Sequence, residues 1–441
     1  MKKKNILFWL CILPLSLVAQ QRWTLKECIA YGLKNNRSTQ VYLNEKKIAD
    51  AKAKEALAAH LPTISLSGTI DDNLKVQETI IPAGVFGPTD TRVAFTKQFS
   101  TNATAQLDQT FFDFSLITGL KANKYNKQQA ELNIIKNEET IIFNISTAYY
   151  QIFVYQEQLD FLKANQETYK KQMEISRLQV NKGVLLQKEL DKITVDYNNA
   201  VSQAVVAESN LSLSQNQLKF EMGFPFEDPL EVERSGVAQS PVLPTPNMIS
   251  VAAITDYRIS ETEAKLLEID EKKIKTGIYP KLTAYARYGG VGFGDQLGQS
   301  FSSISDFSVI GLKLNFPILD FFKRNAQYNQ AKFKRINAQE NLKIDENRYQ
   351  LEYQNSRTKV TKEFINIENN KRTIDLAKSV LDVTDLQYQK GTVPLSEWLT
   401  AQQYLKEAQN NYLSSLYNYL LAKIELEKAS GTLKTAYSSQ H

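Results

Sequence analysis

The chain of 441 residues contains only two histidines and two cysteines. Two histidines, His60 and His441, are too few for a histidine-rich metal site, and no catalytic triad with a well-placed imidazole is expected. Of the cysteines, Cys11 lies in a segment that we expect to be removed, which leaves Cys28 alone and predicts no intrachain disulfide and no thiolate cluster.

Signals of enzymatic chemistry are also missing. No nucleophile is paired with a base, and no glycine-rich loop opens a helix in a way that would cradle phosphate; Gly289–Gly292 is expected to lie in a loop between strands. The sequence therefore predicts a protein that is not an enzyme and that needs no cofactor.

Long apolar runs are absent after the N-terminus: no segment approaches the roughly 18 residues that suggest a membrane-spanning helix. Any membrane-spanning part of the exported protein is therefore expected to be a closed β-barrel. The formal net charge of the whole chain is +5, and removing three N-terminal lysines leaves +5 − 3 = +2. This near balance gives no reason to expect nucleic acid as a partner.

The first 19 residues have the pattern of a secretory signal. Lys2–Lys4 form a basic start, Ile6–Leu13 an apolar core, and Leu17–Ala19 a candidate cleavage site. The apolar core is too short to serve as a membrane anchor of about 30 Å. We expect residues 1–19 to be removed on export.

The remainder of the chain repeats itself. Three short motifs recur at a nearly constant shift of 207 or 208 residues: Phe112-Asp113-Phe114 with Leu319-Asp320-Phe321, Lys182-Gly183 with Lys390-Gly391, and Met222-Gly223-Phe224 with Ser430-Gly431-Thr432. Such a shift predicts two equivalent halves, residues 20–224 and 251–433, with a connector at 225–250 and a tail at 434–441. Five prolines between Pro225 and Pro246 make that connector extended.

Each half contains two stretches in which apolar and polar residues alternate, as in strands with one apolar face and one polar face. The apolar positions are Ile64, Leu66, Gly68 and Ile70; Phe99, Ala103, Ala105 and Leu107; Leu282, Ala284, Ala286 and Tyr288; and Leu312, Leu314 and Phe316. They predict four strands with a lipid-facing band, although ordinary antiparallel strands over a soluble core would show similar alternation. Asp72–Gln98 and Gly289–Asp306 are expected to be long loops. Four strands cannot close a barrel, so several copies would have to contribute.

Long helices fill most of the remaining chain. One is expected over Trp23–Ala59, with a capping box formed by Thr24 and Glu27 and an end at Leu61-Pro62. Two more, Ser115–Lys182 and Lys323–Lys390, cover 68 residues each, or about 100 Å. Apolar residues recur along them in steps of three and four, at Ile141, Ile145, Ala148, Ile152, Tyr155, Leu159 and Leu162, and at Ile367, Ile374, Ala377, Leu381, Thr384 and Tyr388. This narrow seam predicts helices packed side by side as coiled coil in a hollow wall.

Motifs and their order resemble those of the TolC-type outer membrane efflux proteins over nearly the whole mature chain. The most similar stretch is Tyr388–Gln402, YQKGTVPLSEWLTAQ, followed by Asn411-Tyr412, Tyr417–Leu420 and Ser430–Leu433; Leu314–Ile318 before Asp320 resembles the family's passage from strand to helix. The resemblance implies a homotrimer in the cell outer membrane, with a twelve-stranded barrel and an α-helical periplasmic tunnel. It also implies docking on a periplasmic adaptor and an inner-membrane pump, and passive export of substrates through an efflux or type I secretion system.

In this family the two long hairpin turns form the periplasmic tip, where the channel is gated and the adaptor binds. The resemblance therefore makes the turn residues candidates for docking: Gly183, Val184, Leu185, Leu186, Gly391, Thr392, Val393, Pro394 and Leu395. Glycine supplies the positive φ of a tight turn, and apolar residues at an exposed end suggest a docking surface.

The family also places an acidic residue six positions after the tip glycine, and Glu189 and Glu397 fit. A second acid three residues later is replaced by Thr400, and the arginine that latches the closed state is replaced by Val393. Three copies of one carboxylate around an axis would attract cations, so Glu397, Glu189 and Thr400 are candidate pore or gate positions. Each glutamate could instead be part of a solvated helix face. At the level of the whole chain, the competing hypothesis is a periplasmic coiled-coil adaptor or scaffold, which the duplicated pair of strands argues against.

Overall fold

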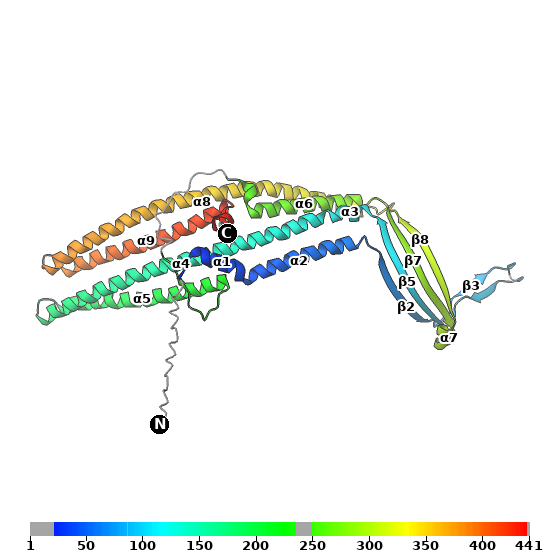
Figure 1. Cartoon of the computed structure of the whole chain (residues 1–441), viewed down its shortest axis with the longest axis horizontal. Helices are drawn as coiled ribbons and strands as arrows, with labels where there is room; N and C mark the ends of the chain where they lie inside the picture. The colour runs from blue at the N-terminus through cyan, green and yellow to red at the C-terminus, as the bar shows by residue number, and fades with distance from the viewer. Residues whose placement is uncertain (1–21, 86, 235–248, 439–441) are drawn as a thin grey trace, which may run out of the picture. The chain divides into compact units, whose positions relative to one another are not determined.

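The computed structural model describes residues 22–85, 87–234 and 249–438, which form long helices and a four-stranded sheet (Figure 1). The signal expected over residues 1–19 lies outside these ranges. The chain divides into two compact units, and each combines segments of both sequence halves. The first unit comprises Met1–Val41, Ile134–Thr255 and Glu346–His441, and the second comprises Tyr42–Asn133 and Asp256–Asp345. Within the described ranges, none of the helices has both the length and the apolar character needed to cross a membrane.

The first unit is helical. Two helical hairpins, α4–α5 and α8–α9, lie side by side (Figure 1). The short helices α1 and α10 pack against them at the end away from the hairpin turns. The bounds are α1 Leu25–Asn35, α4 Ala122–Asn181, α5 Gln187–Met222, α8 Lys323–Gln389, α9 Leu395–Ala429 and α10 Leu433–Ser438. The two long helices expected from the sequence are thus confirmed. The first is interrupted at Lys121, whose N–H bonds back to Thr118 and so ends a short helix, α3 Phe114–Leu120.

The predicted coiled-coil seam is the core of this unit. Ile141, Ile145, Ala148 and Ile152 of α4 are at most 3% exposed and contact Leu218 and Met222 of α5 and Leu420 and Ile424 of α9 in one cluster. A second cluster nearer the turns contains Ala377, Leu381 and Tyr388 of α8. The steps of three and four therefore identified the buried face of each long helix.

The second unit contains the sheet. Its order is β2-β5-β7-β8, every neighbouring pair is antiparallel, and β2 and β8 are the edges. The bounds are β2 Thr63–Asp72, β5 Phe99–Phe112, β7 Lys281–Gly294 and β8 Ile304–Asn315. Helices α2 Arg37–Ala58 and α6 Thr255–Thr276 lead into it, and Lys127 at the start of α4 forms an ion pair of 2.8 Å with Asp50 of α2. The four predicted strands are confirmed.

Two predicted loops are wrong. Asp72–Gln98 contains a separate two-stranded hairpin, β3 Glu78–Ile81 and β4 Thr91–Ala94. Most of Gly289–Asp306 is ordered as well: β7 runs on to Gly294, α7 Leu297–Ser302 follows, and β8 begins at Ile304. The glycines of this stretch allow α7 to pack closely on β7 and do not mark a loop. A Cβ at Gly292 would stand 1.8 Å from the Ser300 carbonyl oxygen of α7.

The N-terminal helix has the predicted capping box, in which the Glu27 N–H donates to the Thr24 hydroxyl and Glu27 accepts from the Thr24 N–H. It does not continue unbroken to Ala59. Asn36 is extended, with a ψ of 127°, and its side-chain oxygen accepts from the Ser38 N–H at 2.8 Å, so the chain restarts as α2. In the described part of the connector, residues 231–232 form the short strand β6, which pairs in parallel with β1 Arg22–Trp23. Residues 235–248 of the connector lie outside the described ranges.

Candidate functional site

The two long hairpins end in turns with the same backbone geometry. Gly183 and Gly391 have φ angles of 72° and 73°. After the first helix, the Gly183 N–H donates to the Val180 carbonyl and the Val184 N–H to the Gln179 carbonyl, both at 2.9 Å. The second turn repeats these bonds 208 residues later. This pair of bonds with a left-handed glycine is the Schellman motif, which satisfies the last carbonyls of a helix.

The first turn presents apolar side chains to solvent. Val184 is 76% exposed and Leu186 64%, while Leu185 is half-buried. Among the residues that the structure describes, neither side chain belongs to a buried cluster, and exposed apolar side chains of this kind are typical of surfaces that contact another molecule.

The second turn has a different surface. Thr392 and Pro394 are exposed, Val393 is half-buried, and Leu395 is only 4% exposed. Val393 and Leu395 pack in the cluster that joins the two hairpins. Among the nine candidate docking residues, the exposed apolar side chains therefore come mainly from the first turn.

Buried side chains next to the turns hold the two hairpins together. Trp398 of α9 is 1% exposed, stacks edge-on against Tyr169 of α4 at 5.9 Å between ring centroids, and donates its indole N–H to Asp385 of α8 at 2.9 Å. The Tyr388 hydroxyl of α8 also donates to the Gln179 side chain of α4, at 3.2 Å. From the sequence, Trp398 is singled out only as part of a motif; its hydrogen-bond partner Asp385 lies 13 residues earlier, on another helix.

The three candidate gate residues differ in their surroundings. Glu189 is largely covered, with a side chain 18% exposed, and pairs with Lys192 at 3.1 Å. Glu397 is exposed in the first turn of α9, and within the described part of the chain no side chain pairs with it. Thr400 is exposed and donates its hydroxyl to the Ser396 carbonyl at 2.9 Å. Glu397 therefore carries the uncompensated charge.

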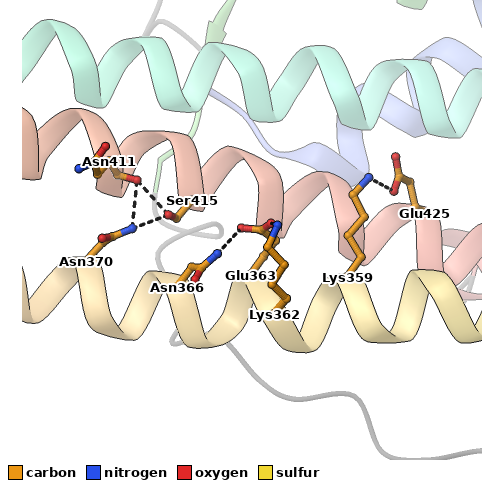
Figure 2. Close-up of polar contacts among 8 residues, drawn as sticks. All are labelled: Lys359, Lys362, Glu363, Asn366, Asn370, Asn411, Ser415 and Glu425. Atoms are coloured by element: carbon orange, nitrogen blue, oxygen red, sulfur yellow. Dashed lines mark hydrogen bonds and ion pairs between the residues drawn. The ribbon is translucent and has the colours of Figure 1, made fainter.

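A polar ladder that the sequence did not suggest joins α8 to α9 (Figure 2). Asn370 donates to the Ser415 hydroxyl at 2.6 Å and to the Asn411 carbonyl at 3.3 Å, and Lys359 pairs with Glu425 at 2.7 Å. Between these contacts, Glu363 is 4% exposed and accepts from Asn366 at 3.1 Å. The Glu363 contact lies within α8, and the contacts that cross to α9 are only partly buried; they favour one register of the α8–α9 hairpin and therefore one position of its turn.

The sheet separates apolar from polar side chains. Its register aligns Ile64 of β2, Leu107 of β5, Ala286 of β7 and Ile310 of β8 across one face, and Leu66, Ala105 and Tyr288 one step further. This apolar face is open, with Leu66 82% and Ile310 88% exposed. On the other face, Gln106 donates to Asp108 at 2.7 Å and Thr104 to Asn102 at 2.8 Å. The predicted division into two faces is confirmed.

The family model described as "Outer membrane efflux protein" matches residues 32–223 and 275–432. The chain belongs to this family. The efflux protein is 22% identical over 348 residues to the outer membrane protein TolC of Escherichia coli K12, an alignment that covers 76% of this chain and 70% of TolC. It is 21% identical over 350 residues to the alkaline protease secretion protein AprF of Pseudomonas aeruginosa, covering 76% and 70%.

Its fold is that of solved outer-membrane channels. The crystal structure of CusC superposes with a TM-score of 0.75 at 17% identity, covering 94% of this chain and 95% of CusC. The efflux protein is therefore an outer-membrane export channel and not an enzyme, as the sequence predicted, and the adaptor or scaffold hypothesis is not favoured.

Proposed function

We propose that three copies of this efflux protein form one passive conduit from the periplasm to the exterior. The observation that carries the proposal is the four-stranded sheet, whose edges β2 and β8 are unpaired in the described chain and whose apolar face is open. Three such sheets joined edge to edge supply twelve strands, an even number that can close into an outer-membrane barrel with the apolar face toward lipid. Closure also removes the unpaired edges.

Apolar stripes on the outer faces of the long helices support assembly of several copies. On α5, Val206, Leu213 and Phe220 follow one another at intervals of seven and are 58%, 65% and 64% exposed. On α8, Leu376 and Val383, also seven apart, are 68% and 53% exposed. A repeat of seven is the pattern by which helices pack side by side, so these stripes would be covered by helices of neighbouring copies in a periplasmic tunnel.

The turns at the ends of the hairpins would be the periplasmic tip, where a periplasmic adaptor joins the channel to an inner-membrane pump. Exposed Val184 and Leu186 are the apolar contacts that an adaptor would cover. Glu397, one copy from each subunit, would line the entrance and favour cations. In this proposal the protein conducts and does not select, because the helical wall carries no substrate-specific motif.

Reconstitution into a planar lipid bilayer tests the proposal. We expect discrete conductance steps from purified protein, together with a mass by light scattering of three chains and a heat-sensitive oligomer on electrophoresis. A protein that stays monomeric in detergent and carries no ion current would contradict the channel.

A further inference from the structure

Three glycines near the end of β7 share one face of the sheet. Gly290, Gly292 and Gly294 alternate along the strand, so side chains at these positions would all point to the same side. A Cβ at any of the three would stand within 2.6 Å of Ile304 or Ser300, in the segment that follows β7. The glycines therefore form a flat platform, and helix α7 lies on it (Figure 1).

This platform is part of the apolar face of the sheet. Gly292 lies opposite Thr101 of β5, and the Thr101 hydroxyl is hydrogen-bonded to the Ser300 hydroxyl of α7 at 2.7 Å. Alternate residues of a strand point to the same side, so Thr101 shares its face with Ala105, the partner of Leu66. Helix α7 consequently covers the apolar face, at the end of the sheet away from α2 and α6, and not the polar face.

The carbonyl groups of α7 have partners within the chain. The Ser300 hydroxyl donates to the Leu297 carbonyl at 2.8 Å, and the Gln299 carbonyl accepts from the Ser302 hydroxyl at 3.0 Å and from the Ser303 N–H at 3.2 Å. Carbonyls at the end of a helix otherwise bind water, which the hydrocarbon of a membrane does not supply. These hydrogen bonds therefore suit a helix next to lipid.

The surface of α7 has an open apolar side and a polar start. Leu297 and Phe301, four residues apart and so on one side of the helix, are 45% and 49% exposed. Just before the helix, the Asp295 carboxylate pairs with the Lys97 ammonium at 2.8 Å, and both side chains are exposed. A helix of this kind is typical of the boundary between lipid headgroups and acyl chains.

We infer that α7 lies on the outside of the barrel, with Leu297 and Phe301 among the acyl chains of the outer leaflet, close to the lipid headgroups. The inference rests on the proposed barrel, in which the apolar face of the sheet contacts lipid. Lipid is the expected occupant because α7 lies on that same face, and its open apolar side chains continue the open surface of Leu66 and Ile310. In this position α7 marks the outer limit of the membrane-embedded part of the sheet.

The length of the strand agrees with this depth. Thr101 lies four residues from Ala105, in the middle of β5, which is about 13 Å along a strand. Because strands of outer-membrane barrels are tilted by about 40°, the corresponding difference in depth is about 10 Å, and half of the apolar band is about 12 Å tall. Helix α7 is therefore expected just inside the outer edge of the band, where Phe301 reaches acyl chains and Asp295 reaches headgroups.

Fluorescence quenching of the channel in phosphatidylcholine vesicles tests the position of α7. Phe301→Cys carries an NBD label, and the quenchers are iodide in water and lipids with a nitroxide either near the headgroup or near the end of the acyl chain. Cys28 stays unlabelled because it is fully buried, and burial raises the pKa of its thiol to about 12. We expect the shallow nitroxide to quench the label several-fold more than the deep nitroxide or iodide. Leu297→Cys should give the same result.

Two control variants calibrate the measurement. Leu66→Cys, on the apolar face near the middle of the sheet, should be quenched most by the deep nitroxide. Ser100→Cys, next to Thr101 but on the polar face, has the same depth as α7 and should escape both lipid quenchers.

The pattern of quenching separates the possible failures. A Phe301 label that only iodide quenches would place α7 in water, and a label that no quencher reaches would place it under another part of the protein; either result overturns the inference while the Leu66 label still reports lipid. A Leu66 label that escapes both lipid quenchers would instead overturn the proposed barrel, and the inference with it.

Discussion

Glycine at the end of the two long helices is required by the backbone. Apart from the glycine and its two chain neighbours, no described residue has an atom within 4 Å of the place where a Cβ would stand at Gly183 or Gly391, so the cost of a side chain there is the left-handed conformation itself. That cost is about 1–2 kcal/mol for an L residue. The glycines therefore allow the backbone to turn, and the exposed side chains next to them can contact another molecule.

We predict that Gly391→Ala destabilises the folded protein by about 1–2 kcal/mol, measured as a lower midpoint of thermal unfolding by circular dichroism. Gly298→Ala is the control, because Gly298 lies in α7 with open space around it and no positive φ. It should be neutral or slightly stabilising, since alanine favours helix. Equal losses for both variants would show that the turn conformation is not the reason.

Charge at the tip is unequal between the halves, and this leads to a second prediction. Glu397→Gln should lower the cation preference of the open channel and weaken block by multivalent cations, because three uncompensated carboxylates would be lost from the entrance. Single-channel reversal potentials in a salt gradient measure the effect.

Glu189→Gln is the comparison. The ammonium of Lys192 lies 3.1 Å from the Glu189 carboxylate and already compensates its charge, so the change in reversal potential should be smaller. If the Glu397 variant keeps the reversal potential and the block of the unmodified channel, that residue belongs to a solvated helix face.

At the scale of single elements, the sheet is expected to enter the membrane with Leu66 and Ala105, which are cross-strand partners, toward lipid. Leu66→Arg or Ala105→Arg should impair insertion, because a cation near the middle of the bilayer costs roughly 2–4 kcal/mol. The fraction of heat-modifiable protein in outer-membrane extracts measures this. Ser67→Arg and Gln106→Arg, on the polar face, should be tolerated; an equal response of the two faces would reverse or remove the assignment.

The α4–α5 turn is the element that we expect to dock. Val184→Asp together with Leu186→Asp should abolish export and leave trimer assembly intact, because both side chains are exposed and take no part in the buried clusters. Export measured in cells and oligomer measured on gels separate the two effects. Thr392→Asp adds a charge to the other turn, where the exposed surface is already polar, and should matter less. Normal export by the double variant would remove the docking proposal.

For the whole molecule, assembly should depend on the outer stripe of α5. Leu213→Asp places a charge in the middle of Val206, Leu213 and Phe220, and should shift the protein from trimer to monomer in light scattering, because a buried unpaired charge costs several kcal/mol. Ser212→Asp adds the same charge at the adjacent exposed residue, off the stripe, and should assemble normally. Trimers of normal stability from the Leu213 variant would mean that this stripe is not covered by another copy.

The sequence by itself determined the features that depend on local periodicity. Apolar steps of three and four identified the buried faces of α4 and α8, alternation identified both faces of the four long strands, and the shift of 208 residues predicted two turns with matching glycines. These features could be predicted because the geometry of a helix, a strand or a left-handed turn is decided by residues within a few positions of one another.

Only the tertiary structure decided which side chains at the tip are available for contact. Leu186 and Leu395 look alike in the sequence, but one is 64% exposed and the other packs beside Trp398. The glycines in residues 289–294 predict a loop from the sequence. In the structure these residues are the end of strand β7, and α7 packs closely against them. Burial and close packing depend on residues far apart in the chain, as do the contacts between α8 and α9, and a local pattern contains no information about such neighbours.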